Sequence, residues 1–120
     1  MYIVVTGAGS GIGRSISITL AERGHTLILL GRSFENLEFT KRLLKNPEQH
    51  QCHTCDIRNS EEIKKALENV SSLYALIANA GVGGENQYGD QDRWQEVVDT
   101  NLTGTYQTIQ ECLPLIKKNS

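Results

Sequence analysis

Hydrophobic and polar positions follow two different spacings along the chain, and the spacing changes repeatedly. Short apolar runs, typical of strands buried on both faces of a sheet, occupy residues 2–6, 26–30, 50–55 and 73–78. Apolar residues recur every three or four positions, as in helices, over residues 11–23, 33–44, 59–70 and about 91–117. Strands that alternate with helices predict an open α/β fold with a parallel sheet and helices on both faces.

Residues at the expected ends of these elements support the division. Gly24 is a good stop for the first helix, and Ser33 is placed to cap the second. Asn59 and Glu62 have the spacing of a capping box at the start of the third helix. Pro114 is expected to bend or end the last helix.

Two further expectations concern the third strand and the last helix. The run at 50–55 is less apolar than the others, which favours a place near a sheet edge. On the last helix, the apolar positions form one stripe: Trp94, Val97, Val98, Leu102, Ile109, Leu113 and Ile116.

The length, composition and net charge of the chain favour one soluble domain over residues 1–120. The chain has 38% hydrophobic and 22% charged residues, which is ordinary for a globular protein. Its net charge of −2 gives no electrostatic argument for binding nucleic acid or an anionic membrane. No apolar run approaches the roughly 20 residues that span a bilayer, and the N-terminus does not resemble a signal peptide. We therefore expect a cytoplasmic protein.

The three cysteines, Cys52, Cys55 and Cys112, are an odd number and suggest reduced thiols. Cys52 and Cys55 form a C-x-x-C, so a redox or zinc motif is the rival interpretation. On a strand, however, positions i and i+3 point to opposite faces, and no second pair completes four zinc ligands. The sequence favours buried or half-buried thiols over a metal site.

The stretch TGAGSGIG connects the first predicted strand to the first predicted helix. A helix N-terminus presents free backbone N–H groups and a positive dipole end, which suit a pyrophosphate when no side chain intervenes. Gly7 would permit the turn, Gly11 the close approach of the ligand, and Gly13 close packing of helix on strand. A simple tight turn is the alternative interpretation.

The spacing Thr6-Gly7-x-x-x-Gly11-x-Gly13 resembles the T-G-x-x-x-G-x-G of the short-chain dehydrogenase/reductase family. Asn79-Ala80-Gly81 resembles its N-N-A-G, with Ala78 in place of the first Asn, and Asp56 matches the acid that meets the adenine. Residues 99–104, DTNLTG, resemble its V-N-L-x-G segment. The resemblance implies a Rossmann-type, doubly wound parallel sheet with the order βαβαβαβα, ending before a fifth strand.

The resemblance also implies roles for individual residues. The pyrophosphate and inner ribose would be lined by Gly7, Ser10, Gly11, Ile12 and Gly13. Asp56 and Ile57 would flank the adenine, while Asn79, Ala80 and Gly81 would border the cofactor from the neighbouring strand. Asn101 would be the catalytic residue that kinks the long helix and holds a water of the proton relay; an exposed helix amide is the alternative.

Residues at the end of the second strand determine which nicotinamide cofactor is bound. An acid there binds free ribose hydroxyls, whereas this chain has Gly31-Arg32-Ser33. Arg32 offers a planar guanidinium for a 2′-phosphate, and Ser33 adds a hydroxyl donor. We therefore predict NADP(H) as the cofactor, with NAD(H) less favoured.

The chain contains no Tyr-x-x-x-Lys, the family's proton-transfer pair. We interpret it as the N-terminal, cofactor-binding part of a longer oxidoreductase, inactive alone, whose complete form acts on a small ketone or secondary alcohol. The fourth strand and the long helix would lack cover, which predicts self-association into a homo-oligomer. The loop 82–90 would touch the substrate.

Two other functions remain open. A non-catalytic dinucleotide-binding or redox-sensing module would also need no Tyr-x-x-x-Lys. A relative of nucleotide-sugar epimerases is less favoured, because that group usually has G-x-x-G-x-x-G.

Overall fold

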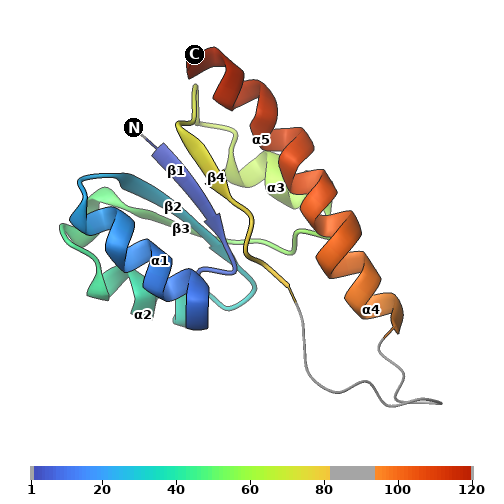
Figure 1. Ribbon diagram of the computed structural model, residues 1–120, viewed down its shortest axis with the longest axis horizontal. Coiled ribbons are helices and arrows are strands. Elements are labelled where there is room, and N and C mark those ends of the chain that lie inside the picture. The colour runs from blue at the N-terminus through green and yellow to red at the C-terminus, as the bar shows by residue number, and fades with distance from the viewer. Residues whose placement is uncertain (1, 82–93, 120) are drawn as a thin grey trace.

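The structure is a computed structural model that describes residues 2–81 and 94–119. Its strands form one sheet in the order β3-β2-β1-β4, and every pair is parallel (Figure 1). The strands are β1 (Tyr2–Thr6), β2 (Thr26–Gly31), β3 (Gln51–Thr54) and β4 (Ala75–Ile77). The helical segments are α1 (Gly11–Glu22), α2 (Phe34–Leu43), the 3-10 turn η1 (Pro47–Gln49), α3 (Ser60–Ala66), α4 (Trp94–Val98), the π-helical segment η3 (Asp99–Gly104) and α5 (Thr105–Asn119). The predicted parallel α/β sheet is confirmed.

Helices cover both faces of the sheet, with α1 and α2 on one face and α3 and α5 on the other (Figure 1). Alternate strand residues supply the two cores, because successive side chains of a strand point to opposite faces. Val4 and Ile28 pack toward α3 and α5, whereas Ile3, Val5 and Leu27 pack toward α1 and α2. All five side chains are at most 2% exposed, so the sheet is a buried middle layer and its strand ends carry the connecting loops.

The outer strands are shorter than the apolar pattern predicted. β3 lies at the sheet edge, as expected, and pairs with β2 alone among the described strands. β4 pairs with β1 over Ala75–Ile77 only. Before β4, the Leu73 N–H donates to the Leu115 carbonyl of α5 at 3.1 Å, whereas the Tyr74 N–H donates to the Tyr2 carbonyl of β1 at 2.8 Å. The start of the run is thus shared between a helix and a strand.

Both predicted N-caps are confirmed, but the predicted capping box is wrong. The Ser33 hydroxyl accepts the Asn36 N–H at 3.2 Å and caps α2. Asn59 caps α3, accepting the Glu61 N–H at 3.0 Å, but Glu62 does not complete a capping box. The Asn59 N–H already donates to the Asp56 carbonyl at 2.9 Å, and Glu62 instead accepts the Asp56 N–H at 3.2 Å.

The last helical region differs most from the prediction. It divides into α4, η3 and α5, and it continues through Pro114 to Asn119 instead of ending there. Pro114 removes the N–H that would bond to Gln110, but both residues are exposed, so water can satisfy that carbonyl.

Much of the predicted apolar stripe is not on the buried face of this region, although Ile116 packs against the core. Leu102, Ile109 and Leu113 are 68%, 43% and 41% exposed. The most buried residues lie four positions apart: Thr100, Gly104, Thr108 and Cys112. These mostly small residues let the helix approach the rest of the molecule closely, which hydrophobicity alone does not signal.

None of the helices in the described residues combines the length and apolar character that crossing a bilayer requires. The predicted substrate loop, residues 82–90, lies outside the described residues.

Candidate dinucleotide-binding site

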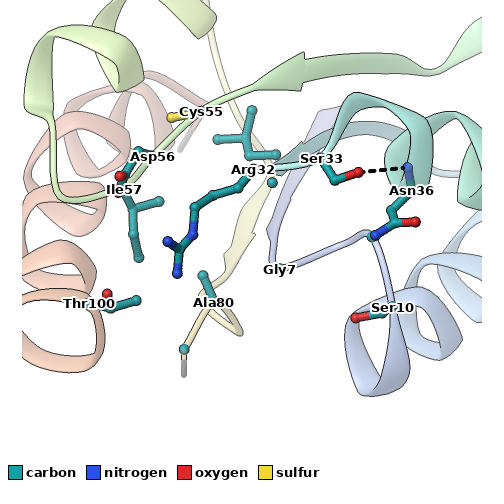
Figure 2. A pocket seen from close by; sticks show the side chains of 14 residues that line it. Gly7, Ser10, Arg32, Ser33, Asn36, Cys55, Asp56, Ile57, Ala80 and Thr100 are labelled. Carbon is teal, nitrogen blue, oxygen red and sulfur yellow. Dashed lines mark hydrogen bonds between the residues drawn. The ribbon is translucent and has the colours of Figure 1, made fainter. Parts of the chain in front are cut away.

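A cavity of about 240 Å³ lies at the carboxyl ends of the strands (Figure 2). Its walls come from the loop between β1 and α1, the ends of β2 and β3, the segment after β4, and η3. The lining residues are Gly7, Gly9, Ser10, Leu30, Gly31, Arg32, Ser33, Asn36, Cys55, Asp56, Ile57, Ala80, Gly81 and Thr100. Connections after parallel strands meet at this edge, which is where open α/β sheets place their ligands.

The glycine loop is shaped by close backbone contacts. A Cβ on Gly13 would lie 2.1 Å from the Gly7 carbonyl oxygen, so no side chain fits there. Gly7 has φ +63° and would place a Cβ 2.9 Å from the Cα of Ala80. Gly11 also has a left-handed φ of +53°, but no atom lies within 4 Å of its virtual Cβ. The backbone is therefore packed too closely around Gly13 and Gly7 to leave room for a side chain, whereas Gly11 borders open space.

Thr6 and Asn79 join the glycine loop to the end of β4. The buried Thr6 hydroxyl accepts the N–H groups of Asn79 and Ala80 at 3.0 and 2.9 Å. The Asn79 amide donates to the Gly7 carbonyl at 3.3 Å. This one cluster fixes the relative positions of two cavity walls that are more than seventy residues apart in sequence.

The outer part of the loop is fixed to α2. The buried Thr40 hydroxyl donates to the Ala8 carbonyl at 2.8 Å. Arg14 donates from Nε to the Thr40 hydroxyl at 2.9 Å and from Nη2 to the Gly9 carbonyl, and its guanidinium lies 4.6 Å from the centre of the Phe39 ring. Both ends of the loop are thus held by residues outside it.

The N-terminus of α1 faces the loop with unsatisfied donors. Ser10 is the N-cap residue, yet its side chain makes no cap hydrogen bond, and the first turn contains no acidic residue. The first N–H groups of a helix have no partner within the helix, and its dipole is positive at this end. The arrangement can accept an anion.

On the other side of the cavity lies a cationic side chain. Arg32 follows the end of β2 and extends toward Ile57 and Ala80 in Figure 2. Within residues 2–81 and 94–119, it makes no hydrogen bond or ion pair. Ser33 next to it uses its oxygen to accept the Asn36 N–H, which leaves its own proton free to donate.

Asp56 is paired with Arg58. Arg58 Nη2 lies 2.7 Å from Oδ2, and Nε lies 3.0 and 3.1 Å from the two carboxylate oxygens. These hydrogen bonds lower the pKa of the Asp56 carboxyl below its ordinary value, and the Arg32 charge adds a smaller effect in the same direction. Asp56 is therefore ionised at neutral pH.

The segment η3 closes the side of the cavity that Arg32, Asp56 and Ile57 line. A Cβ on Gly104 would lie 2.7 Å from Cγ1 of Ile57, so the π-helical turn packs directly on that residue. Thr100 is 4% exposed, and its hydroxyl has no hydrogen-bond partner within the described chain. Gly81 leaves room for Asn101, whose Oδ1 would lie 2.9 Å from a Cβ at that position.

The residues that the sequence singled out divide into two groups. Those that line the cavity are Gly7, Ser10, Arg32, Ser33, Asp56, Ile57, Ala80 and Gly81. Those that do not are Gly11, Ile12, Gly13, Asn79 and Asn101. Of the second group, Gly13 and Asn79 do not line the cavity but contact Gly7, which does. Ile12 is 71% exposed.

Sequence reasoning missed Thr100, Arg14 and Thr40. A signal existed for Arg14, because a basic residue in the first turn of a helix opposes the dipole and needs another reason. Thr100 and Thr40 gave no such signal, because threonines on helices are ordinary.

The cysteines lie as the strand geometry predicted. Cys55 belongs to the core under α3 and α5, whereas Cys52 packs against the core on the opposite face. Burial raises the pKa of each thiol to about 11, so both are protonated at neutral pH. In the described part of the chain, no three His, Cys, Asp or Glu side chains gather to hold a metal ion.

The parallel order β3-β2-β1-β4, the glycine loop and the cavity at the strand ends define a Rossmann-type α/β protein. The chain matches the short chain dehydrogenase family over residues 1–120. An uncharacterized oxidoreductase of Staphylococcus aureus (strain MW2) is 36% identical over 123 residues, which cover 98% of this chain and 53% of the relative. The chain therefore belongs to the short-chain dehydrogenase family of oxidoreductases, and it spans about half the length of the curated relatives it matches.

Solved structures agree with this assignment. Carveol dehydrogenase from Mycobacterium avium, in complex with NAD, has a TM-score of 0.87 and 27% identity over 98% of this chain and 50% of that chain. The alcohol dehydrogenase of the archaeon Thermococcus sibiricus, complexed with 5-hydroxy-NADP, has a TM-score of 0.84 and 29% identity over 98% of this chain and 53% of that one. Similar proteins thus bind either kind of nicotinamide cofactor.

Proposed function

We propose that the chain binds NADP(H) as the cofactor-binding part of an oxidoreductase that interconverts a small ketone and a secondary alcohol. The observation that carries the cofactor choice is Arg32, a cation on the cavity wall without a partner in the described chain. Neither Gly31 nor Ser33 beside it supplies a carboxylate that would repel a 2′-phosphate. The planar guanidinium and the free Ser33 proton suit the oxygens of a phosphate.

The remaining cavity residues fit the rest of a dinucleotide. Open space at Gly11 and the free donors of α1 suit the diphosphate. Asp56 and Ile57 would flank the adenine, and the unpartnered Thr100 hydroxyl would find a polar partner on the ligand. Asn79, Ala80 and Gly81 would border the nicotinamide half.

For the reaction, the bound nicotinamide would supply or accept the hydride. Asn101 would hold a water of the proton relay, since it lies in η3 beside the Gly81 wall. The chain contains no Tyr-x-x-x-Lys, so we expect these 120 residues to bind cofactor without turning over substrate.

We also propose self-association through α5 and the end of η3. Large apolar side chains are exposed along this surface: Leu102, Tyr106, Ile109 and Leu113. Such a row on a soluble protein marks an interaction surface. Light scattering over a range of concentrations tests this, and a monomer at every concentration would contradict it.

The cofactor proposal is tested by titrating NADPH and NADH separately and following nicotinamide fluorescence. We expect Arg32→Ala to weaken NADPH binding about tenfold or more, and NADH binding little, because only NADPH carries the 2′-phosphate. Arg23→Ala is the matched control, because it removes the same charge from an exposed site at the far end of α1. Equal affinity for the two cofactors in the unaltered protein, or no effect of Arg32→Ala, would refute the proposal.

A further inference from the structure

We infer that Arg58 is a positioning residue for cofactor choice: it occupies the Asp56 carboxylate and so leaves Arg32 available for the 2′-phosphate. The inference rests on the proposed NADP(H) function. It assigns a role to a residue that does not itself line the cavity.

The Arg58–Asp56 contact engages both carboxylate oxygens. The backbone N–H of Arg58 donates to Oδ1 at 3.0 Å, in addition to the three side-chain contacts of 2.7 to 3.1 Å. Two-pronged guanidinium–carboxylate pairs of this kind have a fixed geometry as well as attraction. The carboxylate is thus oriented before any ligand arrives.

A local turn creates this contact. The Asn59 N–H donates to the Asp56 carbonyl at 2.9 Å, which closes a turn just before α3. The turn brings Arg58 over the side chain two residues earlier. The Arg58–Asp56 pair needs no residue outside this short segment, so it forms whenever the segment folds.

Arg32 is the other cation near Asp56. Both residues line the same cavity, and the Arg32 charge helps to lower the pKa of Asp56. Yet Arg32 makes no ion pair within the described part of the chain, whereas Arg58 is paired with the acid. Were Arg58 absent, Arg32 would be the remaining cation that acts on Asp56. A guanidinium paired with a carboxylate binds a phosphate less well.

The test compares Arg58→Gln, Asp56→Asn and the double variant with the unaltered protein. The measured quantity is the ratio of the Kd for NADH to the Kd for NADPH, at about 0.15 M ionic strength. A general loss of adenine binding or of folding changes both constants together and cancels in the ratio. Lys64→Gln is the control, because it removes a charge from the exposed Lys64–Glu61 pair on α3.

We expect Arg58→Gln to lower the ratio about tenfold by weakening NADPH binding. In the double variant Arg32 has no acid to pair with, so the ratio returns to that of Asp56→Asn. An equal loss in Arg58→Gln and the double variant would overturn the inference, because Arg58 would then act through its own charge.

Two further outcomes separate this inference from the cofactor proposal. If Arg32→Ala lowers the ratio but Arg58→Gln leaves it unchanged, the inference fails and the NADP(H) proposal stands. If Arg32→Ala leaves the ratio unchanged, the NADP(H) proposal fails and the inference fails with it.

Discussion

The two sides of the cavity are built from different interactions. On the glycine-loop side, main-chain atoms approach so closely that Gly13 has no space for a Cβ, and Thr6 holds two backbone N–H groups. On the opposite side, which we propose as the adenine side, the residues that would distinguish ligands are partly exposed and charged: Arg32, Asp56 and Arg58.

This difference separates two tasks. Backbone contacts are intolerant of substitution, and they would recognise the diphosphate that both nicotinamide cofactors share. Charged side chains at a partly exposed site contribute little to stability, so they can change without unfolding the protein. We therefore expect stability to reside on the glycine-loop side and cofactor preference on the adenine side.

The strongest test of this comparison is Gly13→Ala. Its Cβ would meet the Gly7 carbonyl at 2.1 Å and the Asn79 amide at 2.7 Å, so α1 must move away from β1. We expect a loss of about 3 kcal/mol or more in the free energy of unfolding, measured with urea.

Gly11→Ala is the matched comparison for that measurement. Its φ of +53° costs about 1 kcal/mol for a residue with a Cβ, but its surroundings are open. Equal destabilisation by the two variants would show that backbone conformation, and not the close contact, makes this side intolerant.

Thr6→Val is expected to have the next largest effect. The two side chains have nearly the same shape, but valine cannot accept the Ala80 N–H, which the Thr6 hydroxyl accepts at 2.9 Å. The lost acceptor should lower the free energy of unfolding by about 2 kcal/mol. Thr6→Ser keeps the acceptor and should retain most of the stability in the same urea titration; a loss as large as that of valine would assign the effect to packing.

Thr100→Val should act in the opposite direction on the adenine side. Its hydroxyl is buried without a partner in the described chain, so removing the oxygen should stabilise the ligand-free protein by about 1 kcal/mol. Binding of NADPH and NADH should weaken alike, by about fivefold, because the Thr100 hydroxyl is neutral and so cannot select for the charge of a 2′-phosphate. A loss confined to NADPH would contradict the division between shared and discriminating contacts.

The smallest expected effect concerns pH. Folding lowers the pKa of Asp56, so the folded state binds this proton less readily than the unfolded state. The Asp56–Arg58 pair therefore stabilises the fold at pH values above the pKa that Asp56 has in the unfolded chain, which is near 4. This contribution disappears as the pH falls through the lower pKa that Asp56 has in the folded protein. Urea midpoints of the unaltered protein and Asp56→Asn should differ slightly at pH 7 and converge in acid; a gap that widens in acid would show the opposite sign.

Much of the fold could be predicted because local pattern determines it. The apolar runs located the strands, and the weaker run identified β3 as an edge strand. The prediction failed for the last helix, where Leu113 is exposed while Gly104 and Thr108 are buried. Small residues pack a helix closely against its neighbours, and hydrophobicity does not distinguish them from surface positions.

Sequence alone determined where the glycines stand, that Arg32 follows a strand without an acid beside it, and that the strands run parallel. These properties depend on residues near one another in the chain, and so a linear pattern reveals them. Only the tertiary structure decided that Thr6 would hold Asn79 and Ala80, that Thr40 would bond to Ala8, and that Thr100 would be left without a partner. Such pairings depend on strand register and helix rotation, which the packing of the whole molecule sets.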